Sequence, residues 1–328
     1  MKAAVASLTA ALVLLDGCSG LAQQRVVPQT GSPDATRDAA QLSRTAALSE
    51  LFNLDYSNGS ITVYSIKNGK ATQTKHFTPG HGNAQGIASD SLGQIYTTLT
   101  DSNSKPCSAC VEVFTAGGAL VRRLDAPVLQ GAPGPASLTD ISVDAHENVY
   151  VSDRGQQAVY FFSRGRMTHH GPTVVVQNSQ NAASVAATPN GTYVLVSGGC
   201  GFASVRPYTR VGQGKYSPGS CFGIGTIALI GGAADDQEEV LTPVDGVPAL
   251  VSVSSPNGGN TFHTPDQRFA SISGVALNGD ASVAYVANHH KECVYAFARP
   301  AKGWLSGQPK LLATYKGFKS LDIIAVPR

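Results

Sequence analysis

A short pattern recurs along most of this chain and limits what the chain can fold into. Each copy has an apolar segment, then a turn rich in Gly or Asn, and then a second apolar segment that contains Tyr. Copies lie near Gly86, Asp140, Ser184 and Gly274, at intervals of 54, 44 and 90 residues, and the last interval is about two steps of 45. Such self-similarity means that the chain folds as a series of equivalent units, each packed on its neighbours.

The segments inside each unit have the character of β-strands. Five Asn-Gly dipeptides supply the positive φ angles of tight hairpin turns, and the repeats carry no helical periodicity. Gly and Pro together make up 53 of the 328 residues, and few long helices form at that density of helix breakers. A period of about 40 to 50 residues with four short strands is the signature of a β-propeller blade, so we predict an all-β propeller.

The two ends of the repeat region complement each other. Residues 49–77 carry the later strands of a unit without an opening strand, and residues 320–326 form an opening strand with nothing after it. We expect the C-terminal strand to pair with the first blade, which removes open sheet edges. Opening strands near 86, 140, 184, 229–250, 274 and 322 then give six blades.

The stretch 198–272 is the hardest to assign. It holds candidate middle strands at 203–210 and 225–230 and a candidate opening strand at 251–255. Five blades with one large insertion, or seven blades, therefore remain as alternatives to six.

The units also resemble known propellers. Residues 85–98 and 138–163 are similar to NHL-type repeats, and residues 274–297 are similar to the related YVTN-type propellers of bacterial surfaces; the segments that carry the resemblance are Gly86-Ile87-Ala88-Ser89-Asp90, Val149-Tyr150-Val151-Ser152-Asp153-Arg154 and Ala284-Tyr285-Val286-Ala287-Asn288. The resemblance covers roughly residues 50–328. It implies a superfamily of ligand binders, protein-interaction platforms, lactonases and lyases, so the fold alone assigns no activity.

The N-terminus is typical of an exported protein. Residues 1–17 contain one early lysine and an apolar run that is too short to cross a bilayer, and this run fits a secretory signal peptide. Leu15, Gly17 and Cys18 resemble a bacterial lipobox, in which the Cys is lipidated, whereas Asp16 departs from that pattern. The resemblance implies a lipoprotein of the cell envelope, in the outer membrane or periplasm, with plain secretion as the alternative.

The next segment has a composition that does not fold alone. Residues 18–47 are rich in polar residues and Ala and almost free of aromatics, so we predict a flexible tether, or a short helical spacer near 38–48. Residues 48–328 then form the propeller.

The formal charge of +2 argues against an electrostatic nucleic-acid binder. We expect a monomer that contacts the membrane only through its lipid, with an envelope protein or a small ligand as its partner.

The cysteine pattern fits an oxidising compartment. Cys200 and Cys221 bracket a Gly-rich stretch and are predicted to form a disulfide. Cys107 and Cys110 form a C-x-x-C motif in a polar loop, for which a local disulfide is favoured over a redox motif or a zinc site. Cys293 is interpreted as a small buried residue of a strand.

Two carboxylates occupy the aligned position that should face the central channel. Asp140 and Asp322 stand where the other units have Gly or Ser, and two carboxylates near one axis would hold a cation such as Ca²⁺ or act as acid and base. The structural interpretation is that each Asp accepts hydrogen bonds from backbone N–H groups. His81, in a Gly-rich loop, is the histidine chosen as a channel candidate. We predict no cofactor other than this Ca²⁺, and we assign no residue as a metal ligand.

A second set of candidates lies where the second strand of a unit ends. Asp55, Asp153 and Asn288 occupy this position, and His289 follows the last of them. These residues would either bind a ligand on one face of the blades or make structural hydrogen bonds between strands. The adjacent histidines His289 and His290 point to opposite faces of a strand and do not form a ready chelate.

The sequence favours binding over catalysis. It contains no G-x-S-x-G motif and no P-loop. Calcium-dependent lactonase propellers use an early Glu with later Asn and Asp residues, and the nearest counterparts here, Glu50, Asn181 and Asn288, match poorly. We therefore predict a non-catalytic ligand- or protein-binding scaffold, with a metal-dependent lactonase-like, hydrolase-like or lyase-like enzyme as the alternative.

Overall fold

A computed structural model describes residues 48–80, 83–100, 109–164, 173–176, 182–197, 200, 203–224, 232–244, 250–265 and 272–328. All of these residues lie within the unit Ala40–Arg328. The elements in this part of the chain are β-strands and one short 3₁₀ helix, η2 (Trp304–Ser306), so the prediction of an all-β fold is confirmed. The described residues include no helix that is long and apolar enough to cross a membrane.

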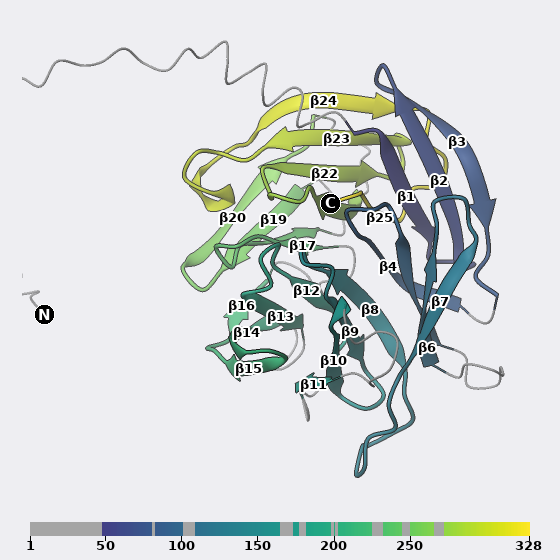
Figure 1. Cartoon of the computed structure of the whole chain (residues 1–328). Coiled ribbons are helices and arrows are strands. Elements are labelled where there is room, and N and C mark those ends of the chain that lie inside the picture. Colours follow the sequence, from purple (N-terminus) through teal and green to yellow (C-terminus); the bar gives the residue numbers. More distant parts are fainter. Residues whose placement is uncertain are drawn as a thin grey trace, which may run out of the picture. The chain divides into compact units, whose positions relative to one another are not determined.

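Four sheets follow the same simple order, in which strands adjacent in sequence pair antiparallel (Figure 1). They contain β4 (Asn83–Ser89), β5 (Ile95–Thr100), β6 (Ala109–Phe114) and β7 (Leu120–Asp125); β8 (Leu138–Val143), β9 (Val149–Asp153), β10 (Ala158–Phe162) and β11 (Thr173–Val176); β12 (Val185–Ala187), β13 (Tyr193–Ser197), β14 (Ser204–Gly212) and β15 (Lys215–Pro218), with β16 (Phe222–Gly223) beside β14; and β17 (Ala233–Ala234), β18 (Val240–Pro243), β19 (Leu250–Ser255) and β20 (Gly258–His263).

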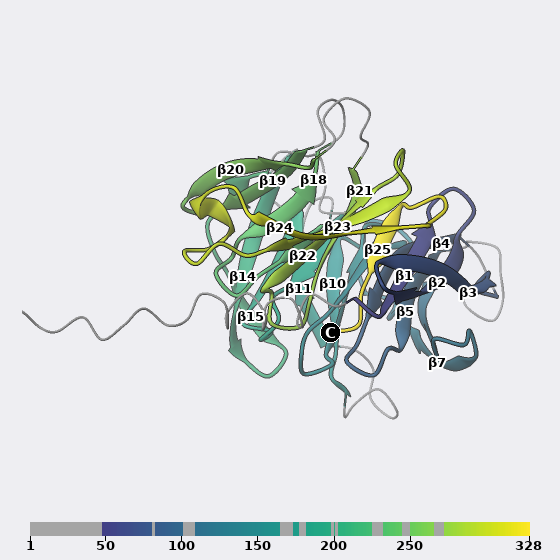
Figure 2. The same cartoon turned by 90° about the horizontal axis from the view of Figure 1, so that it is seen from above.

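The fifth sheet has eight strands and joins the two ends of the repeat region. One half runs through β21 (Ile272–Leu277), β22 (Val283–Asn288), β23 (Cys293–Ala298) and β24 (Lys310–Lys316). β22, β23 and β24 lie side by side in Figure 1, and β21 is labelled in Figure 2. The other half runs through β25 (Ile323–Ala325), β1 (Glu50–Asp55), β2 (Ser60–Lys67) and β3 (Lys70–Phe77). β24 meets β3 through the parallel pair Lys316–Lys70, and β25 pairs antiparallel with β1.

An aspartate holds the turn between the first two strands of several units. In Asp90, Asp144 and Asp235, Oδ1 accepts hydrogen bonds from the backbone N–H groups two and four residues later, at 2.9 to 3.0 Å. The second oxygen of Asp90 and of Asp144 accepts the hydroxyl of the Tyr six residues later, at 2.9 and 3.0 Å. Six residues after Asp235 the chain has Leu241 instead of a Tyr, and the Asp235 carboxylate forms an ion pair with Arg299. The repeat thus encodes a turn and its buried hydrogen bonds together.

Close approach between sheets requires glycine at two aligned positions. A Cβ on Gly86 would lie 2.8 Å from the Asp140 Cα, and a Cβ on Gly274 would lie 2.8 Å from the Asp322 carbonyl oxygen. Both neighbours are backbone atoms, which cannot move aside as a flexible side chain can. Glycine at these positions lets β4 pack against β8 and β21 against β25.

One strand assignment in the difficult stretch is wrong. Residues 251–255 fall in β19, which is the third strand of its sheet, and β17 opens that sheet. Opening and third strands are both apolar and buried here, so hydrophobicity does not distinguish them. The candidate middle strand 203–210 matches β14, and residues 225–230 lie outside the described residues.

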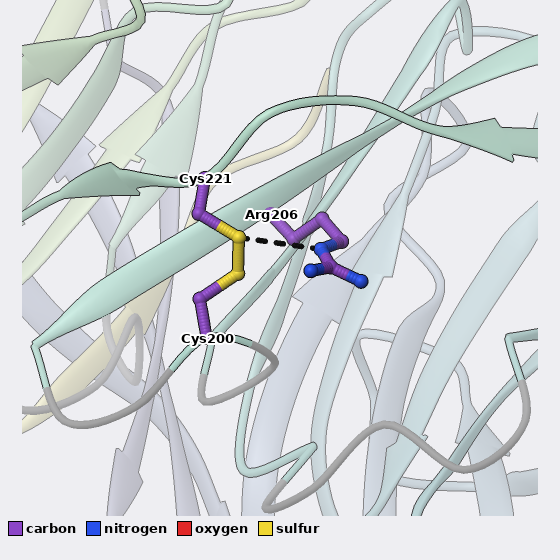
Figure 3. Close-up of a disulfide and its surroundings, with 3 residues drawn as sticks. All are labelled: Cys200, Arg206 and Cys221. Atoms are coloured by element: carbon purple, nitrogen blue, oxygen red, sulfur yellow. Dashed lines mark hydrogen bonds between the residues drawn. A yellow bond between two sulfur atoms is a disulfide. The ribbon is translucent and has the colours of Figure 1, made fainter.

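The predicted disulfide between Cys200 and Cys221 is confirmed (Figure 3). The two cysteines are 21 positions apart in the sequence, and their Cα atoms are 6.2 Å apart. The Arg206 Nε–H donates to the Cys221 sulfur at 3.3 Å. Cys110 is buried in β6, whereas Cys107 lies outside the described residues. Cys293 is buried in β23, with 4% of its surface exposed.

Candidate functional site

A narrow cavity lies between six strands, which we call the opening strands: β4, β8, β12, β17, β21 and β25. Its volume is about 50 Å³, and its lining is mostly small or aliphatic, including Ile87, Ile141, Val185, Ala233, Val275 and Ile324. A water molecule occupies about 30 Å³ of liquid, and pockets for small organic ligands usually measure about 300 to 1,000 Å³. The cavity therefore has room for water or a small ion but not for a sugar or a lactone.

The side chain of Arg328 also lines this cavity. Burial lowers the pKa of its guanidinium to about 10, although the carboxylates of Asp144 and Asp236 favour the charged form. Its buried Nη1 atom has no hydrogen-bond partner among the described residues. The cavity thus holds a positive charge at neutral pH. No motif or repeat in the sequence had pointed to Arg328.

Asp140, the first channel candidate, is held by the backbone. It lies in β8 with 6% of its surface exposed, and its two oxygens accept the N–H groups of Ile141 at 2.9 Å and Val185 at 3.2 Å. The second bond joins β8 to β12 of the next sheet. Burial raises the pKa of this carboxyl to about 7, against the opposing effect of the two amides.

The raised pKa of Asp140 predicts how stability changes with pH. Between about pH 4 and pH 7 the folded protein holds a proton that the unfolded chain releases, so the free energy of unfolding falls as pH rises. From pH 5 to pH 8 the free energy of unfolding of the parent should fall by about 3 kcal/mol more than that of Asp140→Asn, because Asn cannot ionise. Urea unfolding at both pH values measures this difference. Equal losses in both proteins would show that Asp140 does not titrate in this range.

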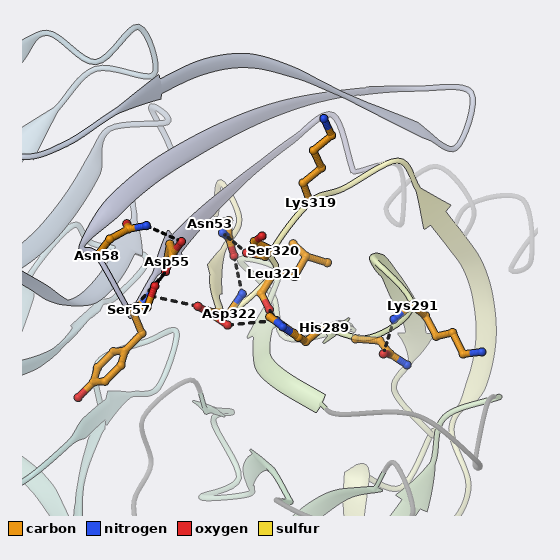
Figure 4. A network of polar contacts seen from close by, with 12 residues as sticks. Asn53, Asp55, Ser57, Asn58, His289, Lys291, Lys319, Ser320, Leu321 and Asp322 are labelled. Carbon is orange, nitrogen blue, oxygen red and sulfur yellow. Dashed lines mark hydrogen bonds and ion pairs between the residues drawn. The ribbon is translucent and has the colours of Figure 1, made fainter.

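Asp322, the second channel candidate, belongs to a different network (Figure 4). Its backbone N–H donates to the Asn53 Oδ1 at 2.8 Å, and its Oδ2 accepts the Tyr56 N–H at 3.1 Å. Its Oδ1 lies 3.2 Å from the His289 Nδ1. Asn53 also donates from Nδ2 to the Ser320 carbonyl at 2.9 Å. These contacts attach the segment before β25 to β1 and to the end of β22.

His289 is the candidate with an atom available for chemistry. Its Nδ1 lies 2.7 Å from the Leu321 carbonyl oxygen and 3.2 Å from the Asp322 carboxylate. Both partners are acceptors, so Nδ1 is the donor to them, and in the neutral form of the ring Nε2 is the acceptor. The side chain is 44% exposed. A histidine oriented in this way accepts a hydrogen bond from a ligand or takes up a proton as a general base.

The other blade-end candidates make turns. Oδ1 of Asp55 accepts the backbone N–H and the hydroxyl of Ser57, at 2.9 and 2.6 Å, and Oδ2 accepts the Asn58 amide at 2.8 Å. Asn288 is fully buried and accepts the Lys291 N–H at 3.0 Å. Figure 4 places Asp55 and His289 in the network around Asp322, so part of the predicted set converges there.

Asp153 lies in a different sheet and is enclosed by donors. Its side chain is fully buried and accepts four hydrogen bonds, from the backbone N–H groups of Ser137 and Gln156, the Gln156 amide and the Tyr160 hydroxyl, at 2.7 to 3.0 Å. Because both carboxylate oxygens already accept hydrogen bonds, Asp153 has the contacts of a residue that stabilises the fold.

The channel carboxylates do not fit a calcium site. Calcium takes six to eight oxygen ligands, whereas each oxygen of Asp140 already accepts a backbone amide. Asp322 makes its contacts with Tyr56 and His289. Across the described residues, no group of three or more His, Cys, Asp or Glu side chains is placed to hold a metal. His81 lies outside the described residues.

Solved structures resemble this chain at low sequence identity. A protein from Lactobacillus plantarum has a TM-score of 0.51 and 14% identity over 85% of each chain. A functionally unknown protein from Desulfotomaculum acetoxidans has a TM-score of 0.51 and 10% identity over 85% of this chain and 86% of its own. The periplasmic gluconolactonase of Pseudomonas aeruginosa has a TM-score of 0.50 and 13% identity over 81% of this chain and 79% of its own.

No family model and no curated protein sequence matches the chain. The likeness to solved structures concerns the fold alone, and it agrees with repeated antiparallel sheets of a β-propeller type.

Proposed function

We propose that this chain is a six-bladed β-propeller of the cell envelope that binds a partner protein or ligand through its surface, without catalysis. The observation that carries the proposal is the cavity between the opening strands. At about 50 Å³ it is too small for an organic substrate. Binding then falls to the strand ends and connecting turns, which is where repeat scaffolds usually carry their sites.

Contacts among the opening strands support six blades. β25 contacts β4, and the series continues through β8, β12, β17 and β21, which contacts β25 again. Four sheets and the two halves of the eight-stranded sheet each supply one opening strand. In this proposal, the pairing of β25 with β1 closes the series with a strand from the C-terminal end.

Envelope anchoring is proposed through lipid on Cys18. We expect the full-length protein to fractionate with membranes, and Cys18→Ala to move most of it to the soluble fraction, because the lipid would be its membrane contact. Immunoblotting of washed membrane and soluble fractions measures the distribution, with Cys293→Ala as the control that removes a different cysteine. An unchanged membrane fraction in Cys18→Ala would rule out this anchor.

A metal-dependent lactonase-like, hydrolase-like or lyase-like enzyme is the second candidate. The observation in its favour is the exposed His289, oriented by Asp322 and the Leu321 carbonyl. The structural resemblance of this chain to a gluconolactonase supports a shared fold but identifies no catalytic residue. Hydrolysis of a lactone by the purified protein, lost in His289→Gln, would favour this candidate over the scaffold.

A further inference from the structure

A second and larger cavity lies away from the opening strands. Its volume is about 420 Å³, and its lining includes Gln237, Glu239, Ser255, Asn257, Lys302 and Leu305. Three segments meet there: the β17–β18 turn, the β19–β20 turn and η2, which packs against β19 and β20. The volume falls within the range of small-molecule pockets, unlike that of the cavity between the opening strands.

Internal hydrogen bonds fix each of these three segments. The Gln237 N–H donates to the Asp235 Oδ1 at 2.9 Å, and the Asn257 N–H donates to the Ser255 hydroxyl at 3.0 Å. In the third segment, the Leu305 N–H donates to the Glu239 Oε1 at 3.1 Å. The backbone that presents the lining side chains is therefore held in place before a ligand arrives, which lowers the entropy lost on binding.

The base of this cavity carries a buried charge that is already compensated. Glu239 is 3% exposed, and its Oε2 accepts the Trp304 N–H at 2.8 Å and the Arg299 guanidinium at 3.1 Å. Gly303 has a φ of +99°, and a Cβ there would lie 2.6 Å from the Glu239 Oε1. Glycine thus allows the segment to wrap around the carboxylate.

The charges around this cavity nearly balance. Asp235 pairs with Arg299 beneath it, while Glu239 and Lys302 stand in its lining. Burial raises the pKa of Asp235 to about 7, so near neutral pH these four groups carry at most one net positive charge and give no strong preference for an anion or a cation. Among the described residues that line the cavity, Leu305 is the one large aliphatic side chain, so a mainly apolar ligand would bury little apolar surface there.

We infer that this cavity binds a neutral, polyhydroxylated ligand, such as one or two rings of a sugar. Gln237 and Asn257 each offer a donor and an acceptor on one amide, which suits neighbouring hydroxyls that also donate and accept. The hydroxyl of Ser255 and the ammonium of Lys302 add hydrogen-bonding groups around the same space. This site is independent of the proposed envelope role, since it stands whether or not Cys18 is lipidated.

Saturation-transfer difference NMR on the full chain tests the inference, with maltose, cellobiose and N,N′-diacetylchitobiose as neutral probes and glucuronate and glucosamine as charged probes. We expect at least one neutral disaccharide to bind, and to bind more tightly than either charged sugar. Gln237→Ala/Asn257→Ala should weaken that binding at least tenfold, because two amide partners are lost.

The matched control is Gln73→Ala/Lys70→Ala, which removes two exposed polar side chains from β3. It should bind the sugar as the parent does. Both double variants change exposed residues, and thermal melting checks that they remain folded. The inference is overturned if no neutral sugar binds, if a charged sugar binds more tightly, or if binding persists in Gln237→Ala/Asn257→Ala.

Discussion

Deletion of residues 320–328 is expected to leave no folded protein. The segment supplies β25 and the buried side chains of Leu321, Ile323, Ile324 and Val326. Burying an aliphatic side chain of this size stabilises a fold by about 1.5 to 3 kcal/mol, and whole domains are stable by about 5 to 15 kcal/mol. Losing four such side chains, together with the pairing to β1, removes most or all of that margin.

Circular dichroism and urea unfolding of the truncated chain measure this outcome. Deletion of residues 327–328 alone is the comparison. It removes the Arg328 side chain from the cavity between the opening strands but leaves every described strand intact, so this shorter deletion should lose some stability and still unfold cooperatively. A 320–328 deletion that melts within a few degrees of the parent would contradict the importance we assign to β25.

Asp153→Ala is expected to destabilise the protein by about 3 to 5 kcal/mol, because four hydrogen-bond donors lose a fully buried acceptor. For a chain of this size the melting temperature should fall by about 10 °C. The same change at Asp55 should cost about 1 kcal/mol or less, since its partners Ser57 and Asn58 are exposed and water replaces the lost bonds.

Thermal melting of the two variants side by side checks this contrast, since both remove the same chemical group at an aligned position. If Asp153→Ala and Asp55→Ala lose equal stability, then the buried hydrogen bonds do not set the cost. A ligand that binds the parent and is lost in Asp153→Ala without loss of stability would restore a binding role for Asp153.

Much of the fold could be predicted from the repeats. The spacing of the apolar segments and of the turns between them placed opening strands correctly at Gly86, Asp140 and Gly274, which lie in β4, β8 and β21, because tight turns between short strands have strong local signals. The stretch 251–255 was placed wrongly as an opening strand. Opening and third strands are both buried and differ only in their long-range partners, which local sequence does not report.

The candidate sites were less predictable for the same reason. Asp140 and Asp322 align in sequence, but Asp140 bonds to Val185 of the next sheet and Asp322 contacts His289. Those partners depend on how neighbouring sheets pack. The turn aspartates carried a usable signal, since Asp90 and Asp144 are each followed six residues later by Tyr. Glu239 with Trp304 carried none, because 65 residues separate them.

Calcium titration of the purified protein, with metal analysis by mass spectrometry and a lactone hydrolysis assay, tests the central claim most directly. We predict no stoichiometric calcium, no shift in melting temperature and no hydrolysis. The cavity between the opening strands is too small for a substrate, and the carboxylates of Asp140 and Asp322 are occupied by backbone amides and His289. Stoichiometric calcium with a melting shift that disappears in Asp140→Asn/Asp322→Asn, or lactone turnover, would contradict a non-catalytic scaffold.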